Sequence, residues 1–493
     1  MTVSGFLLAV SLASICAPRV DAEPPRPRRM PLVRVVDLSI GESREVELCN
    51  GKKVTVRLLD LAEKRDSVLS AVREARVTVA VNGQQAVLHA ALYHLPVTVA
   101  GVRIDCPITR GPVENSHIEH WGLDKDARLR LWPAGSPLLR PGTFVYPVQQ
   151  RWFATSTSMA NEPVSPRPDG KLYYHAGLDL GGAEGLTEVV AATDGLVVSS
   201  ADKVLPGYED TPVAPRYDVV YLLDDQGWHY RYSHFYSIDP AVVPGRTMRM
   251  GQKLGLVGKE GGSGGWSHSH FEIKSRQPSG KWGTQEAYAF LWEAYQNQYK
   301  PRLIAVARPS HHVYTGEKVL LDGSLSWSAS GKLAGYEWAL TDGSKARGPQ
   351  VERTYDRPGS YSEILRVTDS EGRVEYDFAR VLVLDKAAPG RWPPYIHATY
   401  APTWKIRPDD SITFKVRSFG ITTGEGEVWD FGDSSPKVTV KSDGNVNMHA
   451  KHGYATAVHR YAKPGDYLVR VERSDEQGVK AIAHLHVRVE RNP

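Results

Sequence analysis

The sequence of 493 residues has almost no excess of charge of one sign. It carries 60 Lys and Arg against 56 Asp and Glu, which leaves a formal net charge of +4. A balance this even gives no reason to expect a nucleic-acid partner, because nucleic acids are bound by strongly basic surfaces. Long apolar runs are also missing. Residues 6–17 are too few to span a bilayer as a permanent helix, and no other segment is apolar enough, so we expect no membrane span in the mature chain.

The apolar run of residues 6–17 fits a cleaved secretory signal instead. Val20, Asp21 and Ala22 supply small residues at a plausible cleavage site, although no Lys or Arg precedes Phe6. We therefore predict a signal peptide over residues 1–22, with an uncleaved anchor as the alternative. Residues 23–31, EPPRPRRMP, are expected to form an extended, solvated linker. Such a protein would be exported and would be periplasmic, at the cell surface or secreted.

Cysteine is scarce as well, with residues only at positions 16, 49 and 106. Cleavage after residue 22 would remove Cys16 and leave Cys49 and Cys106. In an oxidising compartment these two could pair, and closing a loop of that length would stabilise the fold by about 4 kcal/mol in the chain-entropy model. We predict this Cys49–Cys106 disulfide, with two buried free thiols as the alternative.

The residues that are abundant describe an ordinary soluble globular protein, with 41% hydrophobic and 24% charged residues. The length predicts about three or four domains. Residues 32–143 form the first, a β-rich domain of short β-type runs with a hairpin turn at Asn82-Gly83. The charged segment 62–76 favours a helix. Residues 117–120, HIEH, lack the glutamate position of helical zinc peptidases and are expected to be a solvated turn.

A second β-rich domain is predicted over residues 144–300. It is rich in glycine and in short apolar runs, and a helix is expected to open at Thr284. On that helix an apolar stripe falls on one face and is expected to pack against the C-terminal part of the chain; its members are Tyr288, Leu291, Trp292 and Tyr295.

The last part of the chain is an internal repeat, predicted as domains 301–388 and 389–493. Each copy reads as a strand, a Trp-containing strand, an acidic turn and a Tyr-x-x-Pro-Gly-x-Tyr corner. Copies this similar and this short predict two tandem immunoglobulin-like β-sandwiches, so the fold class is mainly β and multi-domain. They resemble PKD-type domains, with the motif intact as WDFGD at residues 429–433 and looser as WALTDG at residues 338–343.

Histidines gather in the central domain. On a strand, His268, His270 and Glu272 of the stretch HSHFEI share one face, while Phe271 and Ile273 point the other way. Two further stretches supply partners: His234 is expected at the end of a strand that starts near residue 228, and YYHAGLDLGG holds His175 and Asp179. A straight strand would separate these last two by about 13 Å, but a bend at Gly177 could bring them together.

Five such groups suit metal-assisted hydrolysis. A catalytic zinc takes three protein ligands and keeps one position for water, and two imidazoles with a carboxylate fit this ion, although Co and Mn bind the same ligand types. The two remaining histidines could then move protons near neutral pH.

The order His-x-x-x-Asp, Tyr-x-His, His-x-His-Phe-Glu resembles the lysostaphin/LytM-type zinc endopeptidases, over residues 146–274. The resemblance implies that His175, Asp179 and His270 hold zinc, and that His268 and His234 flank the reacting carbonyl, with His268 as general base. Glu272 would either orient a ligand from outside or be an ordinary strand carboxylate. Departures from the pattern are Trp266-Ser267 before the His-x-His, Ser269 within it, and an insertion at residues 205–216.

The resemblance implies an exported zinc metalloendopeptidase that cuts peptides of bacterial peptidoglycan, with C-terminal sandwiches that bind a cell-wall or other extracellular polymer or act as spacers. Two alternatives stay open. One is a catalytically silent relative that only binds or adheres, and the other is an endopeptidase that acts on a glycine-rich secreted protein.

Overall fold

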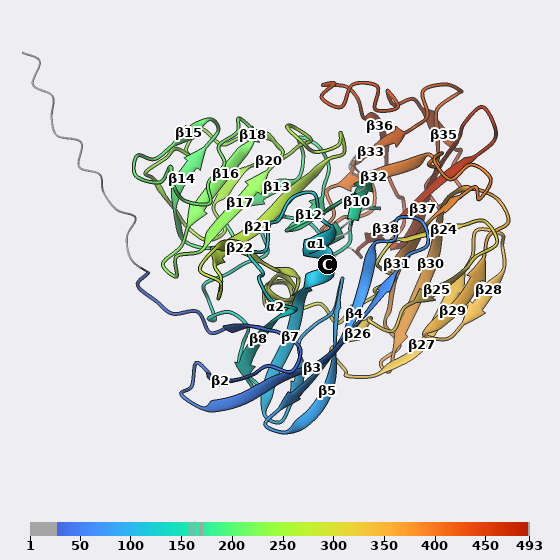
Figure 1. The fold of residues 1–493 in the computed structure, drawn as a ribbon. Helices are drawn as coiled ribbons and strands as arrows, with labels where there is room; N and C mark the ends of the chain where they lie inside the picture. Colours follow the sequence, from blue (N-terminus) through green and yellow to red (C-terminus); the bar gives the residue numbers. More distant parts are fainter. Residues whose placement is uncertain (1–26, 157–158, 161–162, 167–170, 492–493) are drawn as a thin grey trace, which may run out of the picture.

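The computed structural model describes residues 27–156, 159–160, 163–166 and 171–491. The predicted signal peptide lies outside these residues. Within them the chain forms 38 strands and two helices, so the predicted mainly β, multi-domain fold is confirmed. Figure 1 shows the N-terminal domain in blue, the central domain in green and the repeats in yellow to red, with helix α2 between them. No helix in the described part of the chain is long and apolar enough to cross a membrane.

The N-terminal domain is built from two antiparallel sheets that face each other across one apolar core. Their strand orders are β1-β8-β7-β6 and β2-β3-β4-β5. The elements are β1 (Arg34–Leu38), β2 (Ser43–Glu47), β3 (Lys53–Arg65), β4 (Val72–Val81), β5 (Gln84–Ala91), β6 (Val97–Val99), β7 (Val102–Thr109), α1 (Arg110–Asn115) and β8 (Ala127–Pro133).

The helix predicted over residues 62–76 is wrong. Strand β3 continues through Arg65, a turn follows, and β4 begins at Val72. The two strands pair in antiparallel register over almost their whole length, with Val56 opposite Val81 and Arg65 opposite Val72. Helix propensity is a weak preference, and here the long hairpin satisfies the backbone hydrogen bonds of the charged segment instead.

The predicted disulfide is wrong as well, because Cys49 and Cys106 are both free thiols. Cys49 lies in the turn between β2 and β3, whereas Cys106 lies on β7 in the opposite sheet. The Cys106 thiol is buried in the core and contacts the Ile108 carbonyl oxygen at 3.5 Å. Burial raises the pKa of this thiol, so Cys106 behaves as a small apolar side chain.

The described end of the predicted linker is not fully detached from the rest of the chain. The backbone N–H groups of Arg28 and Arg29 donate to the Asp225 carbonyl oxygen at 2.8 and 3.1 Å, and the Arg29 guanidinium pairs with the Asp225 carboxylate at 2.7 Å. All three contacts lie at the surface, where such pairs contribute little to stability.

The central domain is a large antiparallel sheet with the path β15-β14-β16-β17-β21-β12-β9, and a smaller sheet β13-β20-β18 lies beside it. Phe271 and Ile273 are fully buried in the apolar core, as the alternation in HSHFEI predicted. The elements are β9 (Met159–Ala160), β10 (Pro163–Pro166), β11 (Leu172–Tyr174), β12 (Leu178–Gly181), β13 (Glu188–Val190), β14 (Gly195–Ser200), β15 (Lys203–Val204), β16 (Val219–Leu223), β17 (His229–Ser233), β18 (Phe235–Ile238), β19 (Thr247–Met248), β20 (Lys253–Val257), β21 (His268–Arg276), β22 (Trp282–Gln285) and α2 (Tyr288–Tyr299).

Helix α2 starts later than predicted. Thr284 and Gln285 belong to β22, which pairs with β21, and the helix begins at Tyr288. The predicted stripe is buried, and it joins the domains as expected. Trp292 meets Trp327 of the first repeat edge to face at 6.3 Å, and Tyr295 lies 6.2 Å from Trp404 of the second.

The repeats form two β-sandwiches that share a sheet. Strand β30 of the first pairs in parallel with β38 of the second, so one sheet runs through both copies (Figure 1). The elements are β23 (Leu303–Ile304), β24 (His311–Tyr314), β25 (Lys318–Asp322), β26 (Trp327–Ser328), β27 (Leu333–Ala339), β28 (Lys345–Arg347), β29 (Gln350–Thr354), β30 (Gly359–Asp369), β31 (Val374–Leu384), β32 (Tyr395–Ala401), β33 (Ile412–Phe419), β34 (Glu427–Asp430), β35 (Val438–Val440), β36 (Ala455–His459), β37 (Gly465–Ser474) and β38 (Lys480–Val489).

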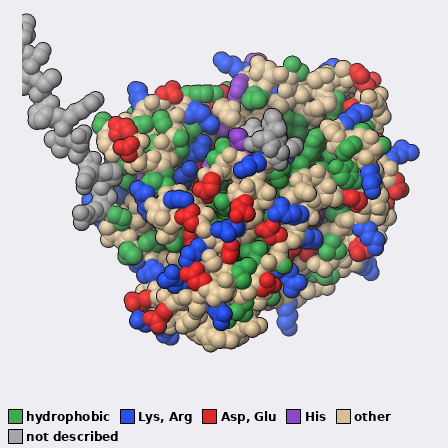
Figure 2. All heavy atoms as spheres, viewed as in Figure 1, with side chains coloured by type: hydrophobic (Ala, Val, Ile, Leu, Met, Phe, Trp, Pro, Cys, Tyr) green, Lys and Arg blue, Asp and Glu red, His purple; other side chains and the backbone are tan. Residues whose placement is uncertain are grey.

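The visible surface carries no large region of one charge. Figure 2 shows Lys and Arg side chains interspersed with Asp and Glu over the whole face. This mixture agrees with the small net charge, and the face in view has no basic groove for a polyanion.

Candidate metal and catalytic site

The register between two neighbouring strands fixes half of the site. Strands β12 and β21 are antiparallel, and Asp179 lies directly opposite His270. Directly opposed residues on one face have Cβ atoms about 4.5–5.5 Å apart, so the carboxylate and the imidazole meet without any special loop. His268, two residues before His270 on β21, lies opposite Gly181.

The bend at Gly177 brings His175 to the same place. Gly177 has a φ of +89°, and a Cβ at this position would lie 2.9 Å from the Phe271 carbonyl oxygen and 3.0 Å from the His270 ring. Only glycine combines this backbone conformation with so close an approach to β21. The sequence-based prediction of a bend here is confirmed.

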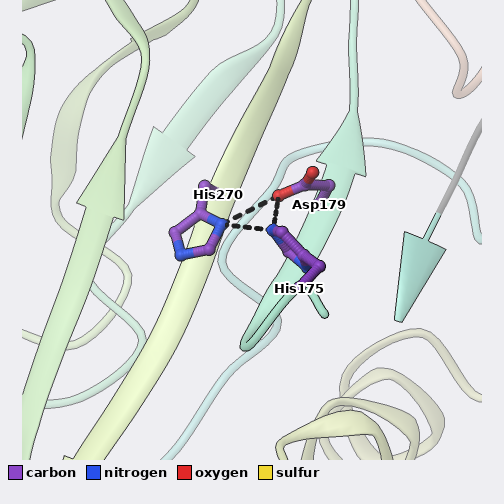
Figure 3. A group of neighbouring side chains, drawn as sticks. All are labelled: His175, Asp179 and His270. Carbon is purple, nitrogen blue, oxygen red and sulfur yellow. Dashed lines mark hydrogen bonds and ion pairs between the residues drawn. The ribbon is translucent and has the colours of Figure 1, made fainter. Parts of the chain in front are cut away.

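His175, Asp179 and His270 converge on one point, and Figure 3 shows their side chains turned toward one another. The Asp179 Oδ1 atom lies 3.0 Å from His175 Nε2 and 2.9 Å from His270 Nδ1, and these two nitrogens are 2.9 Å apart. Among the described residues this is the group of His, Cys, Asp and Glu side chains able to hold a metal ion. Two imidazole nitrogens and one carboxylate oxygen this close together fit a single divalent cation.

Burial makes the charge of Asp179 the dominant electrostatic feature of the site. The residue is 4% exposed, and desolvation alone would raise its pKa. The neighbouring His175 and His268 rings outweigh that effect, together with the hydrogen bonds from His175 and His270, and hold the pKa of Asp179 well below its usual value. A buried anion among imidazoles is the arrangement that a cation would neutralise.

His268 and His234 stand beside this cluster. The His268 Nε2 atom is 3.4 Å from Asp179 Oδ2, and the His268 and His234 rings are 4.6 Å apart. His234 follows the last residue of β17, which lies opposite His270 on β21. Its φ of +70° turns the chain at that point, a conformation that non-glycine residues adopt rarely and often at functional sites. The structure therefore brings together all five predicted polar residues.

One glycine-rich loop, residues 258–267, sets the orientation of both of these histidines. His268 Nδ1 lies 3.0 Å from the Trp266 carbonyl oxygen, and His234 Nδ1 lies 2.6 Å from that of Glu260. Because a carbonyl oxygen only accepts, each Nδ1 must carry a hydrogen and each neutral ring keeps its lone pair on Nε2. Burial lowers the pKa of both rings, and for His268 it does so against the attraction of Asp179. Both rings are therefore neutral at neutral pH.

Two further residues support His234, and neither was predicted. The Asp218 carboxylate accepts the His234 backbone N–H at 3.0 Å and lies 3.3 Å from Nδ1. Arg216 binds that carboxylate with both Nε and Nη2. Asp218 precedes a plain apolar strand, so nothing in the local sequence marks it. Arg216 is the last residue of the predicted insertion.

Glu272 is buried behind His270. Its Oε2 atom is 3.9 Å from His270 Nε2, too far for a direct hydrogen bond, while its Oε1 accepts from the Thr284 hydroxyl at 2.6 Å. Burial opposes ionisation, but Lys274, the nearby His270 ring and the Arg231 guanidinium hold the pKa of Glu272 below its usual value. Its charge therefore faces the outer side of His270 without a direct hydrogen bond, and its role in orienting a ligand stays a prediction.

The HIEH segment forms a turn, as predicted, but it is not wholly solvated. The Glu119 carboxylate caps the turn by accepting the backbone N–H groups of Trp121 and Gly122 at 2.6 and 2.7 Å. His120 packs edge to face on Tyr173, and burial lowers its pKa to about 4. The turn thus holds an uncharged imidazole next to the strand that leads to His175.

Comparisons with known proteins agree with this geometry. Residues 173–281 match the model of peptidase family M23, and residues 301–383 match the model of the PKD domain. All five residues of the site fall within the first match. Over these residues the chain is similar to a metallopeptidase family and then to the PKD domain, and the resemblance predicted from the sequence is confirmed.

Individual relatives are distant. Collagenase ColA of Clostridium perfringens is 28% identical over 81 residues, which are 16% of this chain and 7% of that protein, so the chain spans only a small part of its length. Helicobacter pylori Csd3 aligns at 13% identity with a TM-score of 0.21, covering 52% of this chain and 82% of its own. The fibronectin(III)-like modules of Clostridium thermocellum CbhA align at 13% identity with a TM-score of 0.15, and the alignment covers 38% of this chain and 94% of that chain. TM-scores this low carry no structural conclusion.

Proposed function

We propose that this protein is an exported zinc endopeptidase that hydrolyses peptide bonds in bacterial cell-wall peptidoglycan. The observation that carries the proposal is the convergence of His175, Asp179 and His270 within 3.0 Å of one another, with His268 and His234 beside them. A binding protein has no need for two neutral, oriented imidazoles next to a buried cation site.

The residues divide the chemistry between them. Zinc held by His175, Asp179 and His270 would polarise the scissile carbonyl and lower the pKa of a bound water. His268, whose Nδ1–H is engaged by Trp266, takes the proton of the attacking water on Nε2. His234 stands on the other side of the reacting carbonyl. When His234 takes up a proton from solvent on Nε2, Asp218, 3.3 Å from its Nδ1, stabilises the charged ring, which would donate to the developing oxyanion or to the leaving amine.

The depth of the site favours a slender substrate. The five residues are at most 6% exposed, so bulky substituents next to the scissile bond would keep it from the cation. Peptidoglycan stems and cross-bridges are extended peptides with small side chains, and the lysostaphin/LytM-type enzymes that this domain resembles cut such peptides. We propose that the PKD-type sandwiches bind a cell-wall or other extracellular polymer and so hold the catalytic domain near it.

The test uses the full-length protein loaded with zinc. Purified sacculi and a glycine-rich soluble protein are digested in parallel, and the released peptides are identified by mass, with His268→Ala as the matched inactive control. We expect muropeptides from the sacculi at a rate at least about 100-fold above the control. Release of no peptide above the control from either substrate would overturn the peptidase function. Cleavage of the glycine-rich protein alone would overturn the peptidoglycan assignment.

A further inference from the structure

The second sandwich, residues 389–493, holds the loop that precedes His268. Three of its side chains bind successive parts of the loop backbone. Asn445 Nδ2 donates to the Gly264 carbonyl oxygen at 3.1 Å, Arg417 Nη1 donates to that of Gly265 at 2.5 Å, and the Tyr454 hydroxyl accepts the Ser267 N–H at 2.7 Å. These contacts join positions 152 to 187 residues apart in the chain.

The residue between these contacts, Trp266, links the sandwich to a histidine of the site. Its indole stacks on the His268 imidazole with ring centroids 3.8 Å apart and an angle of 19°. The His397 ring of strand β32 meets the indole at 5.2 Å and 63°. Trp266 is 8% exposed and His397 is fully buried, so the indole is fixed between a sandwich residue and His268.

The contacting side chains are themselves held rigidly. His397 Nδ1 lies 2.7 Å from the Tyr454 hydroxyl. The same hydroxyl accepts from Ser267, and burial lowers the pKa of His397 to about 3, so that the ring bonded to the hydroxyl is neutral. Arg417 is fully buried and binds both oxygens of Asp443 at 2.8 and 2.6 Å. Because these side chains are fixed, their contacts can hold the loop of residues 258–267 in one position.

We propose that the second sandwich is part of the active site: Tyr454, Arg417 and His397 position the loop at Trp266, and Trp266 in turn orients His268. The sandwich thus acts on catalysis as well as, or instead of, on attachment to a polymer. It contributes no ligand to the cation, since His175, Asp179 and His270 all come from β21, β12 and the bend before β12. Loss of its contacts should therefore lower turnover and leave the cation in place.

The main experiment compares Tyr454→Phe with Tyr461→Phe in the full-length, zinc-loaded protein. Tyr461 is a matched control: it belongs to the same sandwich, is 1% exposed, and donates its hydroxyl to the Phe431 carbonyl oxygen at 3.0 Å. In Tyr454→Phe we expect His268 to be misplaced by a fraction of an ångström. This should lower kcat by about tenfold and leave KM and bound zinc unchanged. Tyr461→Phe should keep the wild-type kcat. Equal kcat values in the two variants, or loss of zinc from Tyr454→Phe, would overturn the proposal.

A second pair of variants tests the indole itself. Trp266→Ala removes the surface on which His268 stacks and should lower kcat by about 10- to 100-fold, whereas Trp266→Phe keeps an aromatic face and should restore most of it. If Trp266→Phe were as slow as Trp266→Ala, an aromatic positioning role would be excluded.

The kinetic readouts rest on the proposed function, so one measurement is independent of it. Long-range ¹H–¹⁵N spectra of histidine-labelled, zinc-loaded protein report which ring nitrogen of His268 carries the hydrogen. We expect a pure Nδ1–H tautomer in the wild type and in Tyr461→Phe, and a mixture in Tyr454→Phe and Trp266→Ala. An unchanged tautomer in all four proteins would overturn the positioning role even if no substrate were cleaved. A shifted tautomer without any peptidase activity would sustain it and refute the proposed function alone.

Discussion

The two sides of the site are built in different ways. The cation side, made of His175, Asp179 and His270, is assembled from two adjacent strands and one glycine bend inside the M23 domain. The histidine side, made of His234 and His268, depends on the glycine-rich loop, which the second sandwich holds. The group able to hold a metal ion is thus built from local contacts, whereas the loop beside the other two histidines is held by residues of another domain. Variants that separate cation binding from turnover test this difference between the two sides.

The largest expected effect is a loss of bound cation in His270→Ala but not in His268→Ala. His270→Ala removes a ligand and leaves the Asp179 charge buried with one imidazole fewer, so cation affinity should fall by at least about 100-fold and turnover should vanish. His268→Ala should keep the cation and lose most turnover. Zinc content after dialysis against a weak chelator, measured beside kcat, checks both. Equal zinc retention in the two variants would refute the division into sides.

A large effect is also expected at the bend of the cation side. Gly177→Ala forces a Cβ to within 2.9 Å of the Phe271 carbonyl oxygen in a backbone conformation that alanine rarely adopts. The strain of about 1–3 kcal/mol should be relieved by moving His175 away, which would weaken cation binding by about tenfold or more. Zinc titration with a competing indicator measures this.

The matched control for that substitution is Gly280→Ala. Gly280 has a φ of +83° but no atom within 4 Å of the added Cβ. It shares the backbone strain without the clash, so it should leave zinc affinity at the wild-type value. A loss of zinc affinity as large as that of Gly177→Ala would show that the effect comes from general destabilisation.

A moderate effect is expected on the histidine side from Asp218→Asn. The amide keeps the size of the carboxylate but loses the charge that faces His234 and Arg216, so His234 would be less well oriented and its charged form less stabilised. We expect kcat to fall by about tenfold with zinc affinity unchanged. Asp239→Asn, which alters a carboxylate that caps the Ala241 backbone N–H, serves as the control and should have wild-type kcat. Loss of zinc from Asp218→Asn would contradict the contrast.

The smallest effect on zinc affinity is expected from Thr284, which contacts Glu272 and reaches His270 only through it. Thr284→Val removes the hydroxyl that donates to Glu272 and so loosens a carboxylate that is already 3.9 Å from His270. Zinc affinity should fall by less than about tenfold, because the change acts through two intermediate groups. Thermal unfolding should report a loss of about 1 kcal/mol for the missing hydrogen bond. A loss of zinc affinity as large as that of His270→Ala would place Glu272 in the ligand set.

The sequence predicted the cation side almost completely, because its determinants are local. Alternation along HSHFEI identified which side chains share a face, and a single glycine predicted the bend between His175 and Asp179. The failed predictions were those that depended on pairing and on contacts rather than on the propensity of one segment. Residues 62–76 form the end of β3, a turn and the start of β4, because these two strands pair with each other. Cys49 lies in the turn between β2 and β3, away from Cys106 in the opposite sheet.

The residues that were missed have the same explanation. Asp218, Tyr454 and Arg417 act through contacts that no local pattern encodes. The predicted boundary between residues 143 and 144 illustrates the same limit, because one apolar core contains both Trp132 of β8 and Phe290 of α2. A sequence pattern can divide the chain into segments, but it does not show that residues from two segments pack into the same core.

The strand pair between β30 and β38 bears on how this protein can evolve. Domains are commonly joined by exposed linkers across which few contacts pass. Here the joint is itself part of a sheet, and the second module carries Asn445, Arg417 and Tyr454 at the positions that reach the loop. A replacement module of identical fold would lack those side chains, so we expect the two halves of this protein to be inherited together.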